Sequence, residues 1–368
     1  MKIAVHAKVL SEDKPNGIGV YTYNLLKAIS GIDTENEYTL YSNKPIVQKI
    51  SAANFKEKIL NFPAGWSYIR FPFEFLKRDY DILFVPKEFV PPLFRPKTVV
   101  ACYGFGKKTV KKEHLSAGSW LNMWMGANYA LRVADSIIAI SESVKSDIVE
   151  NCGIGAGKIT VTHLGYDEKL YKPYTDKELQ DNIKLKYGIK SRFIINTSSL
   201  LWHRKNVTRL IAAFKLFQSR SASDYQLLIT GKRGESYEEI VGLISSLDLK
   251  KDVILTDYVP IDDMPLLLNA ADFMVFPSLH EGFGLSVLEA MACGCPVITS
   301  NVSSLPEVVG DAGILIDPYK IEEIASAMEH VAVDGATREK MKQKGSRRAK
   351  TFSWERTARE TLKVFEGV

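Results

Sequence analysis

Short apolar runs alternate with amphipathic stretches along the whole chain. The apolar runs lie at residues 2–6, 82–85, 98–101, 136–140 and 159–161 in the first half, and at 193–196, 227–231, 253–256, 272–277 and 296–299 in the second. Continuous runs of this length are typical of strands buried on both faces, as in a parallel sheet. Helical apolar spacing fills several of the intervals between them. The pattern therefore predicts an α/β fold with a parallel, doubly wound sheet in each half.

One segment of the second half is especially well defined. The strand predicted at 272–277 ends at a proline, and Leu285–Cys293 carries apolar residues at helical spacing. Gly294 follows where a left-handed residue would end that helix. The strand at 296–299 then completes a strand–loop–helix–strand unit with a parallel crossover.

The loop before this helix is suited to a negatively charged ligand. Gly282 and Gly284 flank Phe283 at the helix start, where amides lack internal partners and the helix dipole is positive. A diphosphate fits such a place. Glu281 and Glu289 lie eight positions apart, so we expect both carboxylates to face one ligand and to accept from vicinal hydroxyls of a ribose or sugar. A glycine loop that opens a helix also occurs in many α/β domains without any ligand.

Length and composition are those of a globular protein. A chain of 368 residues is long enough for about two domains. The apolar fraction is 46%, the charged fraction is 25%, and no apolar run reaches the roughly 18 residues of a membrane-spanning helix. The first residues do not read as a signal peptide. The four cysteines show no disulfide framework, and Cys293 and Cys295 are too close and isolated for zinc, so we expect reduced thiols.

The net charge of +5 falls entirely within residues 1–170, where 22 Lys and Arg stand against 17 Asp and Glu. This excess is small, and no basic–aromatic recognition motif accompanies it, so nucleic acid is not an expected partner. An anionic membrane face or a phosphate-bearing acceptor is favoured instead.

Two further segments suggest ligand chemistry in the first half. Gly17 and Gly19 lie at the start of a predicted helix over 20–29, either as a simple tight turn or as a second phosphate-facing helix start. Asp79 and Asp81 have the spacing of a metal-binding pair. They lead directly into the strand at 82–85, which favours a role in ending the preceding turn. Ser141 is expected to cap the helix that follows it.

A cationic and aromatic segment follows the strand at 98–101. Lys107, Lys108, Lys111 and Lys112 precede the stretch Trp120–Met125. Cations beside tryptophan and methionine are typical of a segment at a lipid interface. A solvated lysine face followed by a buried helix explains the pattern equally well, and both interpretations stay open.

Two cations precede a helix in the second half. Asn206 is expected to cap a helix over 207–217, whose apolar residues form one stripe. Lys205, just before it, suits a diphosphate as a point charge. Arg204 and Lys205 could also be two solvated cations at a helix start.

The segment 280–299 resembles the E-x7-E signature of the retaining family-4 glycosyltransferases of GT-B fold. The match continues through Ser303–Glu307 and Gly310–Gly313, and Arg204–Asn206 matches an Arg-Lys-Asn variant of the family. The resemblance implies two Rossmann-like domains that face each other across a cleft. It places an acceptor-binding domain at 1–170, joined by a crossover helix at 354–368, and a nucleotide-sugar-binding domain at 171–353.

The resemblance also implies roles for individual residues. It assigns catalysis to Glu281, Lys205 and Arg204, with Glu281 on the donor sugar's hydroxyls and Glu289 on the ribose. The remaining donor-binding residues that it implies are Gly282, Phe283, Gly284, Leu285, Gly17, Gly19, Ser199, Tyr258 and Val259.

The chain departs from the family pattern at two places. Cys102-Tyr103 stands where many members have a His-Asp pair, and Ser199-Leu200 stands where a Gly-Arg pair is frequent. The histidine's role therefore cannot be carried over. The Tyr103 hydroxyl is the group left to donate a hydrogen bond on the acceptor or sugar side.

The resemblance to bacterial polysaccharide mannosyl- and rhamnosyltransferases sets the functional expectation. We expect retaining transfer of a hexosyl unit, mannosyl first, from a GDP- or UDP-linked sugar to a glycan or lipid-linked acceptor, with no cofactor and no metal. The expected location is the cytoplasm, with peripheral attachment to the inner face of the plasma membrane. The alternatives are a nucleotide-sugar-binding partner without catalysis and a soluble-acceptor synthase of sucrose or trehalose type.

Overall fold

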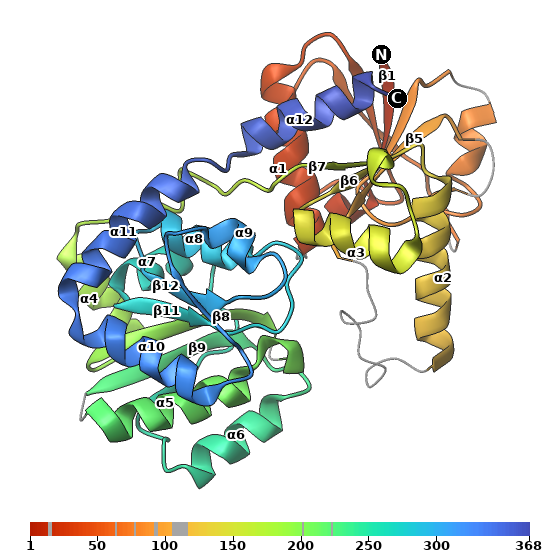
Figure 1. The fold of residues 1–368 in the computed structure, drawn as a ribbon. Helices are drawn as coiled ribbons and strands as arrows, with labels where there is room; N and C mark the ends of the chain where they lie inside the picture. The colour runs from red at the N-terminus through yellow and green to blue at the C-terminus, as the bar shows by residue number, and fades with distance from the viewer. Residues whose placement is uncertain are drawn as a thin grey trace. The chain divides into compact units, whose positions relative to one another are not determined.

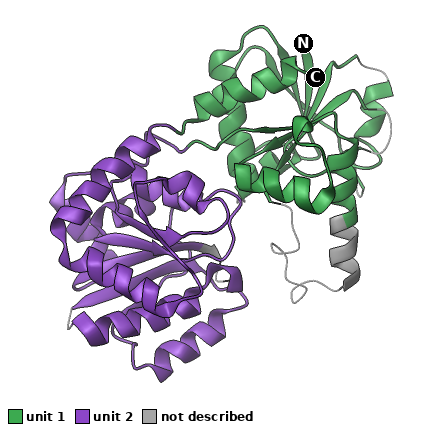
Figure 2. Cartoon of the chain, in the orientation of Figure 1, with its two compact units in different colours: residues 1–165, 352–368 green, residues 166–351 purple. Residues whose placement is uncertain are grey.

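The protein folds into two compact units, residues 1–165 with 352–368 and residues 166–351 (Figure 2). These divisions lie a few residues before the boundaries predicted at 170 and 353. The computed structural model describes residues 1–13, 17–62, 65–76, 79–91, 95–104, 117–200, 202–221 and 224–368, and of residues 117–124 and 199–200 it describes the main chain alone. The four lysines at 107–112 lie outside the described residues.

The first unit contains a parallel sheet with strand order β3-β2-β1-β4-β5-β6-β7 (Figure 1). Its strands are β1 (Lys2–His6), β2 (Glu37–Ser42), β3 (Phe55–Ile59), β4 (Ile82–Val85), β5 (Lys97–Cys102), β6 (Ser136–Ala139) and β7 (Ile159–Val161). Every neighbouring pair is parallel, so all carboxyl ends share one edge of the sheet.

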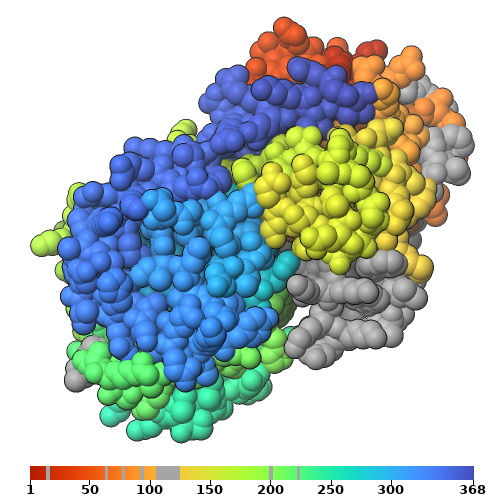
Figure 3. Space-filling model, in the orientation of Figure 1, coloured from red at the N-terminus to blue at the C-terminus, as the bar shows by residue number. Residues whose placement is uncertain are grey.

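The helices of this unit are α1 (Gly17–Ile32), α2 (Ala117–Val133), α3 (Glu142–Cys152) and α12 (Trp354–Glu366). Helix α12 packs on α1 although the two are separated by most of the chain (Figure 1). In the space-filling view the blue C-terminal segment lies at the surface beside the red N-terminal residues of the same unit (Figure 3). Ser141 caps α3 by accepting from the amide of Val144, as predicted.

The second unit contains a parallel sheet with strand order β10-β9-β8-β11-β12-β13. Its strands are β8 (Arg192–Leu200), β9 (Tyr225–Lys232), β10 (Val253–Leu255), β11 (Phe273–Phe276), β12 (Val297–Ser300) and β13 (Ile314–Ile316). Its helices are α4 (Lys177–Lys186), α5 (Val207–Ser221), α6 (Tyr237–Ser246), α7 (Asp263–Ala270), α8 (Leu285–Ala292), α9 (Leu305–Val309), α10 (Ile321–Val333) and α11 (Gly335–Ala349). The two parallel sheets confirm the predicted α/β fold.

Burial follows the apolar runs from which the strands were predicted. Strands β4, β11 and β12 are buried at every position, as expected of strands covered on both faces. The apolar stripe of α5 packs on β8, β9 and α10, with Phe214 and Phe217 fully buried. Gly294 ends α8 with φ +73, as predicted.

The edge strand β3 was not predicted, because its sequence FKEKI looks polar and only pairing with β2 defines it. Charged residues on an edge strand oppose pairing with another molecule.

Asp81 accepts a hydrogen bond of 2.7 Å from the amide of Lys2 and so fixes β4 beside β1. None of the helices in the described part of the chain is long and apolar enough to cross a membrane.

The main chain crosses itself closely where the first unit ends. A Cβ atom on Gly165 would lie 2.1 Å from the amide nitrogen of Trp354 and 2.4 Å from the carbonyl carbon of Ser353. Thr357 donates to the His163 carbonyl over 2.6 Å, and Phe352 packs edge-on against the His163 ring. His163 therefore packs against the C-terminal segment at this crossing.

Candidate functional site

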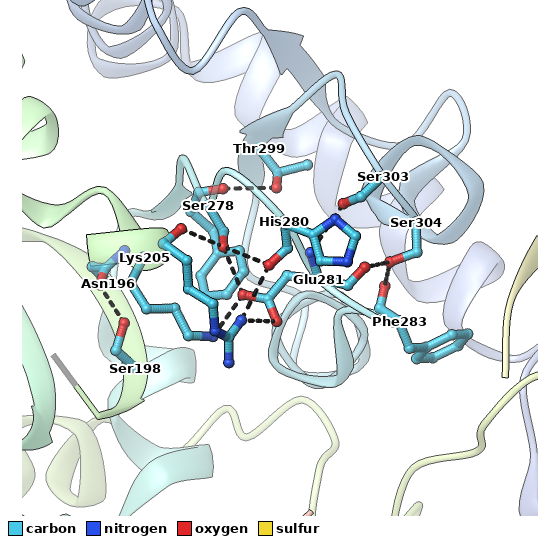
Figure 4. A network of polar contacts seen from close by, with 12 residues as sticks. Asn196, Ser198, Lys205, Ser278, His280, Glu281, Phe283, Thr299, Ser303 and Ser304 are labelled. Atoms are coloured by element: carbon cyan, nitrogen blue, oxygen red, sulfur yellow. Dashed lines mark hydrogen bonds and ion pairs between the residues drawn. The ribbon is translucent and has the colours of Figure 1, made fainter. Parts of the chain in front are cut away.

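The polar residues of the second unit gather at the carboxyl edge of its sheet. Strand β8 leads to the short 3-10 helix η4 (His203–Lys205), β11 leads to Glu281, and β12 leads to Ser303 and Ser304. Because the three strands are parallel, these loops emerge at one edge. Ligands of open α/β sheets bind at the carboxyl ends of the strands, which is this edge. Figure 4 shows the side chains pointing toward one another.

Glu281 binds both predicted cations. Its Oε1 accepts from Lys205 Nζ at 2.6 Å (Figure 4). Its Oε2 accepts from Arg204 Nη1 at 3.1 Å. Ser278 Oγ also lies 2.7 Å from Oε1. Three of the four lone-pair positions of the carboxylate are thus used, and Oε2 has room to accept one more hydrogen bond.

These contacts control the charge of the group. Burial raises the pKa of Glu281, but the charges of Lys205 and Arg204 and the hydrogen bonds from Lys205 and Ser278 outweigh it and lower the pKa to about 2. Burial lowers the pKa of Lys205, and the nearby Glu281 carboxylate opposes this shift. One carboxylate and two cations leave a net positive charge beside the sheet edge.

Hydrogen-bond donors stay available in this cluster. Among the described residues, Glu281 is the only acceptor for Lys205 Nζ. No described residue accepts a hydrogen bond from Nε or Nη2 of Arg204. Lys205 is only 8% exposed and lies 5.0 Å above the Phe276 ring, whereas Arg204 lies over Trp202. The cluster can therefore bind an anion with two cations whose positions are already set.

The loop that carries Glu281 is held by two serines. The Glu281 amide donates to Ser303 Oγ over 3.0 Å, and Ser304 Oγ lies 2.9 Å from the Glu281 carbonyl and 2.7 Å from the Phe283 carbonyl (Figure 4). Ser303 has φ +54, which is uncommon for a residue with a side chain. Such strain is typical of functional sites.

The start of α8 lies directly after this loop. Gly284 has φ +109, and a Cβ there would lie 2.8 Å from Leu305 Cδ2. No described residue accepts from the amides of Leu285 and Ser286, which are the first two of the helix. Phe283 is buried at 3% exposure. The helix start therefore presents unbonded amides and positive dipole charge, as predicted.

Glu289 lies one turn further along α8 in a different environment. Burial raises its pKa to about 8, and a hydrogen bond with Tyr171 opposes this shift. No described residue forms hydrogen bonds with both Glu281 and Glu289. The expectation that both carboxylates face one ligand stays a prediction.

The other residues predicted to bind the donor differ in exposure and lie in both units. Tyr258 is 64% exposed with Lys232 over its ring, and Val259 is buried. The Ser199 side chain lies outside the described residues. Gly17 is the first residue of α1 and Gly19 is buried in its first turn, so both belong to the first unit.

Tyr103 has a structural contact in the first unit. Its hydroxyl donates to the Pro86 carbonyl over 3.0 Å, and its amide donates to Glu88 Oε1 over 2.9 Å. In this conformation its hydroxyl hydrogen is already used.

The cap predicted at Asn206 is wrong. Its amide group donates to the Pro277 and Pro318 carbonyls over 3.0 and 2.7 Å, and its Oδ1 accepts from the Arg209 side chain. Asn206 itself has φ +60 and ends η4. It therefore connects the loops after β8, β11 and β13 instead of bonding a helix amide. Sequence reasoning also missed Ser278, for which the only signal is its position directly after the proline that ends β11.

Two family models match the chain. The model of group 1 glycosyl transferases matches residues 179–348, and that of Glycosyltransferase Family 4 matches residues 15–170, so together they match most of the chain. Over 272 residues the chain is 30% identical to the serotype-specific mannosyltransferase WbdA of Escherichia coli, a match that spans 73% of this chain and 33% of WbdA. Over 237 residues it is 33% identical to the O-antigen chain mannosyltransferase B of Escherichia coli, spanning 64% of this chain and 62% of that protein.

A solved structure of similar fold is that of HepE from Anabaena in complex with UDP and glucose. Its TM-score is 0.78 at 19% identity, and the match spans 100% of both chains. The chain therefore shares the fold of that structure over its full length.

Proposed function

This chain belongs to family 4 of the glycosyltransferases, with the GT-B fold, and we propose that it transfers a mannosyl unit with retention from a nucleotide-diphosphate sugar. The donor is GDP- or UDP-linked, and the acceptor is a glycan or lipid-linked glycan of a cell-surface polysaccharide. The mannosyltransferase names of the two Escherichia coli relatives support the choice of sugar. The chain matches only about a third of WbdA and under two thirds of mannosyltransferase B, so their full activities are not carried over.

One observation carries the proposal: Glu281 fixes Lys205 and Arg204 at the carboxyl edge of the sheet, next to the unbonded amides of α8. As the bond from sugar to phosphate lengthens, negative charge grows on the leaving diphosphate and positive charge grows on the sugar. The two cations and the amides around Phe283, Gly284 and Leu285 would stabilise that negative charge without reorganisation. No metal ion has a role in this scheme.

The two glutamates have separate roles in the proposal. Glu281 has room at Oε2 for one hydroxyl of the donor sugar, in addition to holding the cations. Glu289 accepts from the ribose hydroxyls. We do not assign Glu281 as a covalent nucleophile, because its pKa is low and two cations hold it. Glu289 is not assigned as one either, because in the proposal it binds the ribose. Attack on the same face, with the leaving phosphate taking the acceptor's proton, is the proposed retaining route.

The first unit is proposed to bind the acceptor, with the Gly17–Gly19 turn on the donor phosphates, and the second unit is proposed to bind the donor. The excess of cations in residues 1–170 favours peripheral attachment of the protein to an anionic membrane surface. Co-sedimentation with anionic vesicles at low salt tests this attachment. Changing the four lysines at 107–112 to glutamate should abolish it, and undiminished binding of that variant would remove the idea.

The activity is tested by incubating the protein with GDP-mannose, UDP-glucose and related donors, with and without glycan acceptors. We expect release of the nucleoside diphosphate and a product whose anomeric configuration, read by NMR, is that of the donor. A protein that binds nucleotide but consumes no donor would instead support a non-catalytic partner subunit. An inverted product would exclude the proposed route.

A further inference from the structure

The first unit has its own ligand-binding position, set by topology. Strands β1 and β4 are parallel neighbours. The chain leaves β1 toward β2 on one side and leaves β4 toward β5 on the other. Connections that diverge in this way open a crevice at the carboxyl ends of the two strands. In this unit those ends are His6 and Val85.

The loop after β4 places an amine and an acid at this position. Lys87 and Glu88 are both partly buried, and among the described residues neither takes part in a salt bridge. Burial raises the pKa of Glu88, whereas burial and the charge of Lys8 lower the pKa of Lys87. Partly buried charges without ion-pair partners cost folding free energy, so such groups are candidates for a functional site.

The loop is held in one conformation. The Lys87 amide donates to the Val85 carbonyl and the Phe89 amide donates to the Lys87 carbonyl, each over 2.8 Å. Tyr103, at the end of β5, connects to the loop twice, through its hydroxyl to Pro86 and through its amide to Glu88.

Aromatic packing also holds the loop after β4 in place. The Tyr103 ring packs edge-on against Tyr21 of α1 at 5.2 Å. Phe89 lies 5.4 Å from the buried ring of His6, whose Nε2 lies 2.9 Å from Ser67 Oγ. The Lys87 ammonium lies 5.2 Å from the Phe89 ring centre. The acid and the amine therefore have fixed positions.

Glu88 has unused hydrogen-bonding capacity. One oxygen accepts the Tyr103 amide, the carboxyl also interacts with the backbone N–H of Glu88 itself, and the Cys102 thiol is a weak donor to it. An ionised carboxylate has about four acceptor positions, and an ammonium has three donors. A carboxylate beside an ammonium is suited to vicinal hydroxyls, which both donate and accept.

We propose that Glu88 and Lys87 bind hydroxyls of the acceptor glycan, Glu88 as hydrogen-bond acceptor and Lys87 as donor. This inference rests on the proposed function, because it names residues that bind the acceptor of that reaction. It also places the acceptor contact after β4, whereas the family resemblance left Tyr103, after β5, as the group on the acceptor or sugar side.

Ionisation of Glu88 should make acceptor kcat/KM depend on pH. The groups that face Glu88 are Lys87 in its own loop, Cys102 at the end of β5 and Tyr103 directly after it, while Lys8 and Glu12 act on Lys87. Ionised Glu88 is the stronger hydrogen-bond acceptor, because it is charged and carries no proton of its own, and burial raises its pKa. Acceptor kcat/KM should therefore rise with pH through that raised pKa, and this limb should be absent from Glu88→Gln.

The test compares wild type, Glu88→Gln and the control Glu150→Gln, which changes an exposed carboxyl of α3 in the same unit. GDP-mannose and UDP-glucose are the donors, and octyl glycosides of mannose, glucose, galactose and N-acetylglucosamine are the acceptors. Glu88→Gln should lower acceptor kcat/KM roughly tenfold to hundredfold, mainly through KM, as expected for a lost hydrogen bond to a charged group. Nucleotide affinity should stay within twofold, and Glu150→Gln should match wild type.

The outcomes separate the two claims. Unchanged acceptor kinetics in a folded Glu88→Gln variant would overturn the inference alone. A wild type that consumes donor but neither binds nor glycosylates any of the four glycosides would also count against it. If wild type consumes no donor, the proposed function fails and the inference falls with it. If Glu88→Gln does not fold, Lys87→Gln provides the same test.

Discussion

Lys205 donates a 2.6 Å hydrogen bond to Glu281, and the two side chains are only 9% and 12% exposed. A buried ion pair is weak evidence for stability, because desolvation offsets much of the attraction. Its position at the carboxyl edge of a parallel sheet, beside unbonded helix amides, favours a role in binding and catalysis.

Lys205→Ala should lower turnover by roughly 10²–10³, the loss expected when one preorganised donor to the transition state is removed. Steady-state rates with the best donor provide the measurement. Arg220→Ala is the matched control, because it breaks an exposed ion pair with Glu329 in the same unit and should change little. A Lys205→Ala rate within threefold of wild type would refute the catalytic role.

Gly284→Ala should destabilise the protein by at least about 1 kcal/mol, because alanine is strained at φ +109 and its Cβ meets Leu305. Nucleotide affinity should fall as well, since the amides of α8 would shift. Gly242→Ala, inside α6 with open space around it, should instead stabilise by roughly 0.5–1 kcal/mol. Urea unfolding measures both. Equal effects of the two changes would show that Gly284 has no special conformation.

Glu289 should make stability depend on pH. A carboxyl whose pKa is raised in the folded state contributes stability that is complete below the unfolded pKa and is lost as the pH rises through the folded value. Burial raises this pKa from 4.5 to about 8. Wild type should therefore lose stability relative to Glu289→Gln as the pH rises from 6 to 8.

Glu281→Gln is the control for this titration. The Glu281 pKa of about 2 lies below its unfolded value, so its contribution is present at neutral pH and is lost only as the pH falls below about 4.5. The difference between wild type and Glu281→Gln should stay constant from pH 6 to 8. Parallel curves for wild type and Glu289→Gln over that range would contradict the raised pKa.

The crossing at Gly165 predicts a further effect. A methyl group there meets main-chain atoms of Ser353 and Trp354 that cannot rotate away, so Gly165→Ala should cost about 1–3 kcal/mol or more. Limited proteolysis should cut α12 sooner in this variant. Gly157→Ala, in open space in the same unit, should leave both measurements unchanged. A stable, protease-resistant Gly165→Ala variant would disprove the close approach.

Much of the fold could be predicted because burial shapes the sequence locally. Strand β1 was predicted with its observed bounds, since its central residues Ile3, Ala4 and Val5 are apolar and buried. Gly294 was predictable because few residues other than glycine end a helix at positive φ. The edge strand β3 was missed because its polarity reflects exposure and its structure depends on β2.

The sequence allowed the residues of the site to be predicted, but not all of the contacts that these residues make. Asn206 looked like a helix cap, but its amide bonds the carbonyls of Pro277 and Pro318, which lie 71 and 112 positions away. Such tertiary partners leave no local pattern. Likewise, nothing in the spacing indicates that Glu281 binds both Arg204 and Lys205.

Calorimetric titration with nucleosides and nucleoside diphosphates tests the central claim most directly. If the two cations and the α8 amides hold the diphosphate, GDP or UDP should bind at one site per chain, at least tenfold more tightly than guanosine or uridine. The same diphosphate should bind at least tenfold more weakly to Lys205→Ala. Nucleosides that bind as tightly as their diphosphates, or the absence of binding by any nucleoside diphosphate, would contradict the account.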